Sequence, residues 1–189
     1  RNILSSLSSD FSLPIVLCLH RLRDFRSGLC ESLRQVSTLD ILEPEDKSPV
    51  FGQMVYLAPA NYHLLFEDTN HFVLSVDEEV NFSRPAIDLT FDSAARVFGK
   101  KVLVILLSGA NSDGVKGISN CKDNGGYTMV QDPDDAAVAT MPKNAIKYFS
   151  PDKIATEKEI IQFLNKINKG NIKPKAKLEK SKPSVRFIK

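Results

Sequence analysis

Residues 102–114 read VLVILLSGANSDG, an aliphatic run of six residues followed by a polar loop that contains Gly109 and Gly114. An uninterrupted run of Val, Ile and Leu is typical of a central parallel strand that helices cover on both faces. The pattern after the loop predicts a helix over residues 114–124, which a Gly-Gly pair would end. A strand, a loop and a helix in this order predict one unit of a parallel α/β sheet.

The same alternation extends outward along the chain in both directions. Apolar runs predict strands over residues 15–19, 54–58 and 127–131, and helical spacing predicts helices over 25–36, 87–98, 142–149 and 156–167. Thr156 and Glu159 have the spacing of a capping box at the start of the last helix. Residues 63–66 and 72–76 predict a small antiparallel hairpin. We therefore expect an α/β fold with a mainly parallel sheet and helices on both faces.

Size and composition narrow the class of protein. The chain has 189 residues, of which 42% are hydrophobic and 25% charged, as in a single globular domain. Its longest aliphatic run has six residues, whereas a membrane-spanning helix needs about 20. The first residues lack the layout of a signal peptide. Three widely spaced cysteines without a CxxC pair favour reduced thiols, so we expect a cytoplasmic protein.

Charge is distributed unevenly along the chain. The formal net charge is only +2, which gives no indication of nucleic-acid binding, but residues 166–189 hold nine Lys or Arg and one Glu. We therefore divide the chain into a domain over residues 1–168 and a basic, flexible tail over residues 169–189. With few large apolar groups, this tail is expected to be removable without unfolding the domain. It is either a solvated extension or an electrostatic tether to an anionic surface.

Two reactive side chains follow predicted strands. His20 ends the strand at residues 15–19, and Asp113 lies in the loop after residues 102–107. Sites in open parallel sheets form where loops leave the carboxyl ends of strands. On neighbouring strands, a His and an Asp could form a general base and the carboxylate that orients it. Spacing alone leaves a second interpretation open, in which His20 is an ordinary strand-end residue and Asp113 a helix N-cap.

Two other kinds of site are not expected. Gly109 and Gly114 have the separation of a phosphate-binding loop, but Val115 and Lys116 follow where that loop needs Lys and Ser or Thr. His63 and His71 are eight residues apart, and no Cys or His pair has the spacing of a zinc site. We therefore expect neither nucleotide nor metal binding.

Six segments, in order, resemble the catalytic domain of the CheB family, the protein-glutamate methylesterases of bacterial chemotaxis. They are Ile15 to His20, Gly52 to Pro59 leading to His63, Arg84 to Asp88, Leu107 to Gly114, Gly125-Gly126 with Gln131-Asp132, and Met141-Pro142 with Ala145-Ile146. The resemblance covers roughly residues 1–168. It implies a three-layer α/β/α, Rossmann-like domain with a Ser-His-Asp triad and without a metal or organic cofactor.

The resemblance also assigns roles and partners. His20 matches the general base, Asp113 the carboxylate that orients it, and the loop at Ala110 the backbone donor to the oxyanion. The implied activity is hydrolysis of glutamate methyl esters, with deamidation of glutamine, on the cytoplasmic helices of methyl-accepting chemoreceptors. The alternatives are a catalytically inactive signalling or scaffold domain of the same fold and a general hydrolase of small esters. Arg84 and Asp88 are expected to support the site, or Arg84 to hold an acidic substrate segment.

The chain departs from the family pattern before Arg1, after His20 and in the glycine loop. After the histidine, Arg21 to Asp24 stand where the family usually has a turn that contains Met-Pro. The family's nucleophilic serine follows the first strand and is expected about 5–10 residues before Arg1, together with an upstream receiver domain that this chain does not contain. The serines near the start of the chain are therefore expected to be helix or loop residues: Ser5, Ser6, Ser8 and Ser9. Ala110-Asn111 also stands where the family has Met-Gly.

Overall fold

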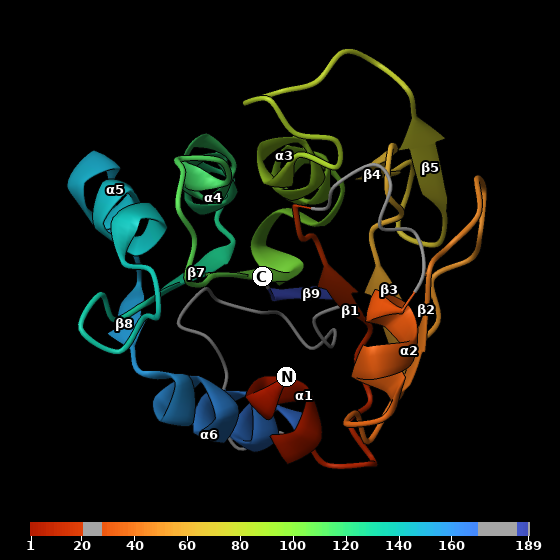
Figure 1. The fold of residues 1–189 in the computed structure, drawn as a ribbon, viewed down its shortest axis with the longest axis horizontal. Helices are drawn as coiled ribbons and strands as arrows, with labels where there is room; N and C mark the ends of the chain where they lie inside the picture. The colour runs from red at the N-terminus through yellow and green to blue at the C-terminus, as the bar shows by residue number, and fades with distance from the viewer. Residues whose placement is uncertain (21–27, 170–184, 189) are drawn as a thin grey trace.

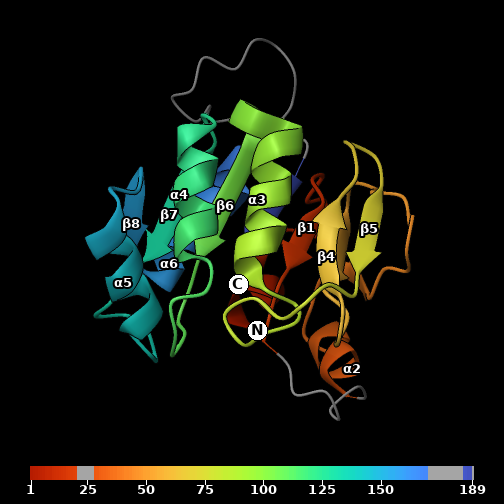
Figure 2. The same cartoon turned by 90° about the horizontal axis from the view of Figure 1, so that it is seen from above.

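A computed structural model describes residues 1–20, 28–169 and, for the backbone alone, 185–188. Seven parallel strands form the main sheet in the order β2-β3-β1-β9-β6-β7-β8 (Figure 1). Their bounds are β1 (Ile15–Leu17), β2 (Asp40–Leu42), β3 (Met54–Leu57), β6 (Val102–Leu106), β7 (Tyr127–Gln131), β8 (Lys153–Ala155) and β9 (Val185–Ile188). An antiparallel pair, β4 (His63–Phe66) and β5 (Phe72–Ser75), stands apart from this sheet beside α3 (Ile87–Phe98) (Figure 2).

Helices cover both faces of the sheet and complete three layers. On one face lie α3, α4 (Val115–Asp123) and α5 (Thr140–Tyr148), and on the other lie α1 (Asn2–Ser6) and α6 (Glu157–Asn168) (Figure 1). The short α2 (Leu29–Arg34) lies near β2 and β3, and a 3-10 turn over Gly99–Lys101 links α3 to β6. No helix in the described ranges has the length and apolar character needed to cross a bilayer. The expected α/β/α architecture is confirmed.

Side-chain alternation along the strands explains the two cores. In β6, Val102, Val104 and Leu106 pack into the cluster under α3, α4 and α5. Leu103 and Ile105 point to the opposite face and join the cluster under α1 and α6. All five side chains are at most 2% exposed, which is why this strand carries no polar residue. The predicted capping box also forms: the Thr156 side chain accepts from the Glu159 N–H, and Glu159 in turn binds the Thr156 backbone.

The end of the chain departs from the expectation. Residues 185–188, assigned to the flexible tail, form β9 and pair in parallel with both β1 and β6. A four-residue strand enclosed by two others is stabilised by its backbone ladder, and a count of large apolar residues does not register that contribution. Residues 169–184 separate α6 from β9, and 170–184 and 189 lie outside the described part of the chain. Short strands β2 and β8 were also missed, since three residues carry too little pattern.

The place of β9 in the sheet gives a test. Proline at position 186 removes a backbone N–H from a strand that pairs on both sides, so Arg186→Pro is expected to lower the free energy of unfolding by about 1–3 kcal/mol. Arg186→Ala keeps the N–H and is the matched control. Urea unfolding of the two variants measures the difference, and equal midpoints would show that β9 contributes nothing to stability.

Candidate active site

The site lies where the order of the strands reverses. From β1 the sheet continues outward through β3 to β2, and from β6 it continues the other way through β7 to β8. Ligand sites in open α/β sheets form at such a switch point, outside the carboxyl ends of the strands. His20 follows β1 and Asp113 follows β6, so they flank this point. The sequence predicts that His20 and Asp113 follow neighbouring strands, but this is wrong because β9 lies between β1 and β6.

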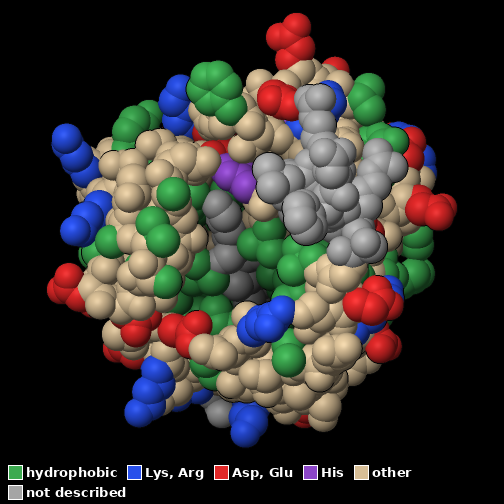
Figure 3. All heavy atoms as spheres, viewed as in Figure 1, with side chains coloured by type: hydrophobic (Ala, Val, Ile, Leu, Met, Phe, Trp, Pro, Cys, Tyr) green, Lys and Arg blue, Asp and Glu red, His purple; other side chains and the backbone are tan. Residues whose placement is uncertain are grey.

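The two side chains meet across the switch point. His20 Nε2 lies 2.5 Å from Asp113 Oδ2, although the residues are 93 positions apart in the chain. The His20 side chain is 25% exposed and that of Asp113 is fully buried. Figure 3 shows that this face of the molecule is hollowed, with hydrophobic side chains along part of the wall. The fold therefore brings together His20 and Asp113, the two residues that the sequence predicts as a base and its carboxylate.

The Asp113 carboxylate also holds the start of a neighbouring helix. Ile87 and Asp88, the first two residues of α3, donate their N–H groups to Asp113 at 2.7 and 3.1 Å. The Asn81 side chain and the Gly114 N–H donate to the same carboxylate at 3.0 Å each. With His20 this makes five donors. Asp113 is therefore not the N-cap of the helix that follows it, where Gly114 has that position. Its carboxylate instead binds free amides at the start of α3, from another part of the chain.

These contacts keep Asp113 ionised. Burial alone would raise the pKa of Asp113, but the hydrogen bonds from His20, the α3 amides and Asn81 outweigh it and lower the pKa below its usual value. The adjacent Asp88 shows the opposite shift. Burial and the charge of Asp113 raise the pKa of Asp88, against hydrogen bonds from Gly117 and from Asn81. One Asn81 amide nitrogen thus donates to both carboxylates.

The hydrogen bonds determine the tautomer of His20. Because ionised Asp113 can only accept, Nε2 of His20 must carry the hydrogen. Nδ1 then has the free lone pair, and the Asn111 side-chain amide lies 3.1 Å from it. In the described part of the chain, no hydroxyl or thiol hydrogen-bonds to this ring. The atom that can accept a proton is therefore Nδ1, which the sequence could not indicate.

The backbone N–H groups of Gly109 and Ala110, in the loop between β6 and α4, differ in whether they are already hydrogen-bonded. Gly109 donates its N–H to the Val138 carbonyl at 3.0 Å and accepts from the Met141 N–H at 2.9 Å. Ala110 is exposed, and among the described residues its N–H has no acceptor. The Ala110 amide is thus available to a ligand, whereas that of Gly109 is not.

A second group of residues shapes the loop before α3. Arg84 donates to the carbonyls of Val76 and Asp77 at 2.6 and 2.9 Å, so its guanidinium braces this loop. Buried His63 binds the Glu78 carbonyl and the Ala86 N–H. Asn81, which the sequence analysis did not single out, has a φ of +53° and places its amide on Asp113. Only its type, an Asn that tolerates left-handed backbone, could have indicated it.

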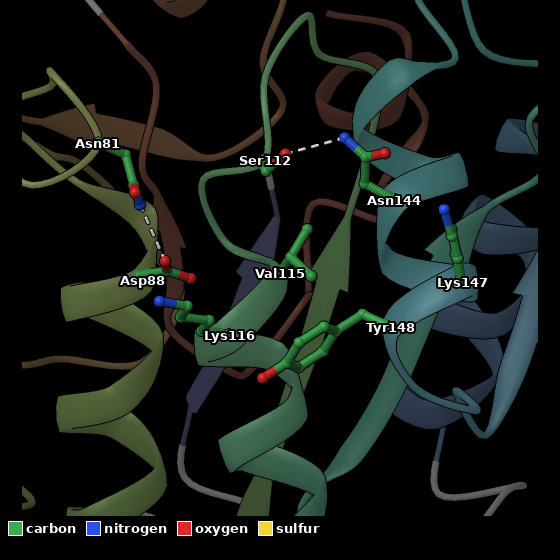
Figure 4. A pocket seen from close by; sticks show the side chains of 8 residues that line it. All are labelled: Asn81, Asp88, Ser112, Val115, Lys116, Asn144, Lys147 and Tyr148. Atoms are coloured by element: carbon green, nitrogen blue, oxygen red, sulfur yellow. Dashed lines mark hydrogen bonds between the residues drawn. The ribbon is translucent and has the colours of Figure 1, made fainter.

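A cavity of about 370 Å³ adjoins the carboxylates between α3, α4 and α5 (Figure 4). It is lined by Asn81, Asp88, Ser112, Val115, Lys116, Asn144, Lys147 and Tyr148. Neither His20 nor Ala110 lines it, so it is separate from the exposed side of the His-Asp pair. In residues 1–20 and 28–169 no group of three or more His, Cys, Asp or Glu has the arrangement of a metal site.

Gly114 permits the close packing around Asp113. Its φ is +89°, and a Cβ there would lie 2.7 Å from Leu106 Cδ1 and 2.9 Å from Ile87 Cγ2. Gly114→Ala is therefore expected to cost about 2–4 kcal/mol in the free energy of unfolding. Gly28 has a φ of +97° and open space around it, so Gly28→Ala measures backbone strain without the clash. Similar losses in urea unfolding would contradict the packing argument.

The lowered pKa of Asp113 predicts a pH dependence of stability. A carboxyl whose folded pKa lies below its unfolded value stabilises the fold above the unfolded value, near 3.8, and that contribution is lost as the pH falls through the folded pKa. Asp113→Asn is expected to cost about 1–3 kcal/mol at pH 7 and less near pH 2. Urea midpoints at both pH values test this, with exposed Asp40→Asn as the control. A loss that does not depend on pH would contradict it.

Comparison with known proteins places this geometry in a family. The sequence profile described as CheB methylesterase matches residues 1–164. A Leptospira interrogans relative is 38% identical over 172 residues, which cover 91% of this chain and 89% of that protein. The protein-glutamate methylesterase/protein-glutamine glutaminase of Thermotoga maritima is 34% identical over 77% of this chain, but the match spans only 43% of that protein's length.

A solved structure agrees with the sequence matches. The crystal structure of the Thermotoga maritima CheB methylesterase catalytic domain aligns with a TM-score of 0.81 and 30% identity, covering 87% of this chain and 88% of that domain. On the sequence profile and the fold together, the chain belongs to the CheB methylesterase family.

Proposed function

We propose that this chain is the catalytic domain of a protein-glutamate methylesterase that hydrolyses glutamate methyl esters, and deamidates glutamine, on chemoreceptor helices in the cytoplasm. The observation that carries the proposal is the 2.5 Å contact between His20 Nε2 and the buried, ionised Asp113. A base held in one tautomer by a carboxylate is the part of a serine hydrolase that activates the nucleophile.

The nucleophile in this proposal is a serine outside the described residues, encoded before Arg1. Its Oγ attacks the ester carbonyl carbon while His20 Nδ1 takes the hydroxyl proton. The tetrahedral intermediate then expels methanol, to which His20 returns the proton, and an acyl-enzyme remains. Water, deprotonated by the same Nδ1, attacks the acyl-enzyme carbonyl; the ester bond to the serine breaks, His20 returns the proton to the serine Oγ, and the glutamate side chain leaves as a carboxylate. Asp113 stabilises the imidazolium at each step without accepting its proton.

Ala110 is proposed as a donor to the oxyanion. Its exposed N–H has no acceptor within the described residues. On one side of it, Gly109 is held by two backbone hydrogen bonds, and on the other side Asn111 and Asp113 contact His20. A backbone donor needs no particular side chain, so alanine in place of the family's methionine leaves this role intact.

The surface near the site favours a macromolecular substrate. Phe82 directly follows Asn81, whose amide touches Asp113, and its side chain is 98% exposed. An exposed aromatic side chain beside a site can bury more apolar surface against a protein helix than against a small ester. This observation ranks receptor helices above small esters as the substrate. An upstream receiver domain would regulate the site in the proposed full-length protein.

The proposal is tested with protein that includes the residues encoded before Arg1. His20→Ala is expected to lower release of methanol from a methylated receptor peptide by at least about 1,000-fold, with little change in the urea midpoint. His71→Ala is the matched control, since His71 is an exposed histidine that pairs with Asp68. Turnover unaffected by loss of His20 would refute the mechanism.

Two further results separate the alternatives. Replacement of the expected upstream serine by a residue without a nucleophilic group, together with absence of turnover, would identify an inactive signalling or scaffold domain. Equal efficiency on p-nitrophenyl acetate and on the receptor peptide would identify a general hydrolase of small esters.

A further inference from the structure

The Asn111 side chain connects the two members of the His-Asp pair. Its Oδ1 accepts from the backbone N–H of Asp113 at 3.1 Å, and its Nδ2 lies 3.1 Å from His20 Nδ1. Asn111 and Asp113 lie in the loop between β6 and α4, whereas His20 follows β1, so one short side chain touches the orienting residue and the base.

The chemistry of the partners determines how this amide is oriented. An N–H can be bound only by the amide oxygen, which assigns Oδ1 to the Asp113 backbone. Nδ2 must then face His20, where it is a donor. It therefore needs a lone pair on Nδ1, and that is the tautomer that Asp113 imposes from the other side of the ring. The two contacts of the imidazole are thus mutually consistent.

The hydrogen bond to Asn111 restricts a rotation of the His20 ring that the hydrogen bond to Asp113 permits. An imidazole that is hydrogen-bonded only through Nε2 can tilt about the line from Nε2 to Asp113 Oδ2. Such a tilt would move Nδ1 away from the position that it has in the structure. The His20 side chain is 25% exposed, so packing covers it only in part. A hydrogen bond at Nδ1 fixes the ring at two points, and misplacement of a base by about 1 Å can cost 100-fold in rate.

We propose that Asn111 is a positioning residue that holds the His20 ring, whose Nε2–H tautomer Asp113 sets, with Nδ1 directed at the reacting groups. The amide occupies the place of the nucleophile's hydroxyl and yields it when that hydroxyl donates its proton. The catalytic part of this inference rests on the proposed function, whereas the positioning of the ring does not.

The competing explanation is that Asn111 only shapes its loop through the bond to the Asp113 N–H. Asn111→Asp separates the two, because a carboxylate keeps an acceptor for that N–H but replaces the donor that faces Nδ1. A carboxylate at this distance favours a proton on Nδ1. Asn144→Ala is the control, since Asn144 binds Ser112 in the same loop without touching His20.

The ¹⁵N resonances of the His20 ring provide a readout that needs no substrate. We expect unprotonated Nδ1 and protonated Nε2 in the wild-type protein and in Asn144→Ala, and a protonated Nδ1 in Asn111→Asp. Should Asn111→Asp fail to fold, Asn111→Ala is expected to keep the Nε2–H tautomer that Asp113 sets and to shift the ¹⁵N resonance of Nδ1, because the Nδ1 lone pair loses its amide donor. Ring resonances that are the same in the wild-type protein and in the Asn111 variant would overturn the inference.

Kinetics of the protein with its upstream residues then test the catalytic part. Asn111→Ala is expected to lower kcat by about 10- to 100-fold and to change KM by less than about twofold. An unchanged kcat would refute the catalytic role. If the wild-type protein hydrolyses no ester while the ¹⁵N resonances of the ring still respond to Asn111, the proposed function fails and the positioning of His20 stands.

Discussion

Asp113 is a carboxylate buried without a lysine or arginine partner among the described residues, and its charge must therefore be stabilised by hydrogen bonds. Five donors supply them, from the β1 end, from the loop before α3, from the first turn of α3 and from the residue that follows Asp113. These elements are far apart in sequence. Each must be in place for the charge to be tolerated, so the carboxylate fixes the angle at which α3 starts and the position of His20 together.

The sequence predicted the parts of this arrangement that depend on one strand at a time. His20 and Asp113 could be named because each follows an apolar run, and α3 could be bounded at Ile87 and Phe98 because its apolar spacing and Gly99 are local signals. Asn81 could not, since it reaches Asp113 through a left-handed backbone turn that no periodicity marks. The nitrogen of His20 that faces Asp113 is likewise a result of how two loops approach one another.

Strand β9, between β1 and β6, shows a second limit on what the sequence can predict. Composition separates chains that can form a core from those that cannot, and by that criterion residues 169–189 are a tail. A strand enclosed on both sides is stabilised instead by backbone groups that every residue carries. It also lies between the two strands that lead to the site, and the loops that follow β1 and β6 bring His20 and Asp113 to within 2.5 Å of each other despite this separation.

The structural and catalytic interpretations of Asp113 are therefore not alternatives. Capping α3 lowers the pKa of the carboxyl, and a carboxylate that is ionised for structural reasons is one that can orient an imidazole. The neighbouring Asp88 shows why the donors matter, because burial next to a charge raises its pKa while Asp113 remains ionised. A helix N-terminus supplies its donors whether or not a substrate is bound. The fold thus maintains the charge that the base depends on, and the Asn111 amide at Nδ1 is, within the described residues, the contact of His20 that the reaction itself has to displace.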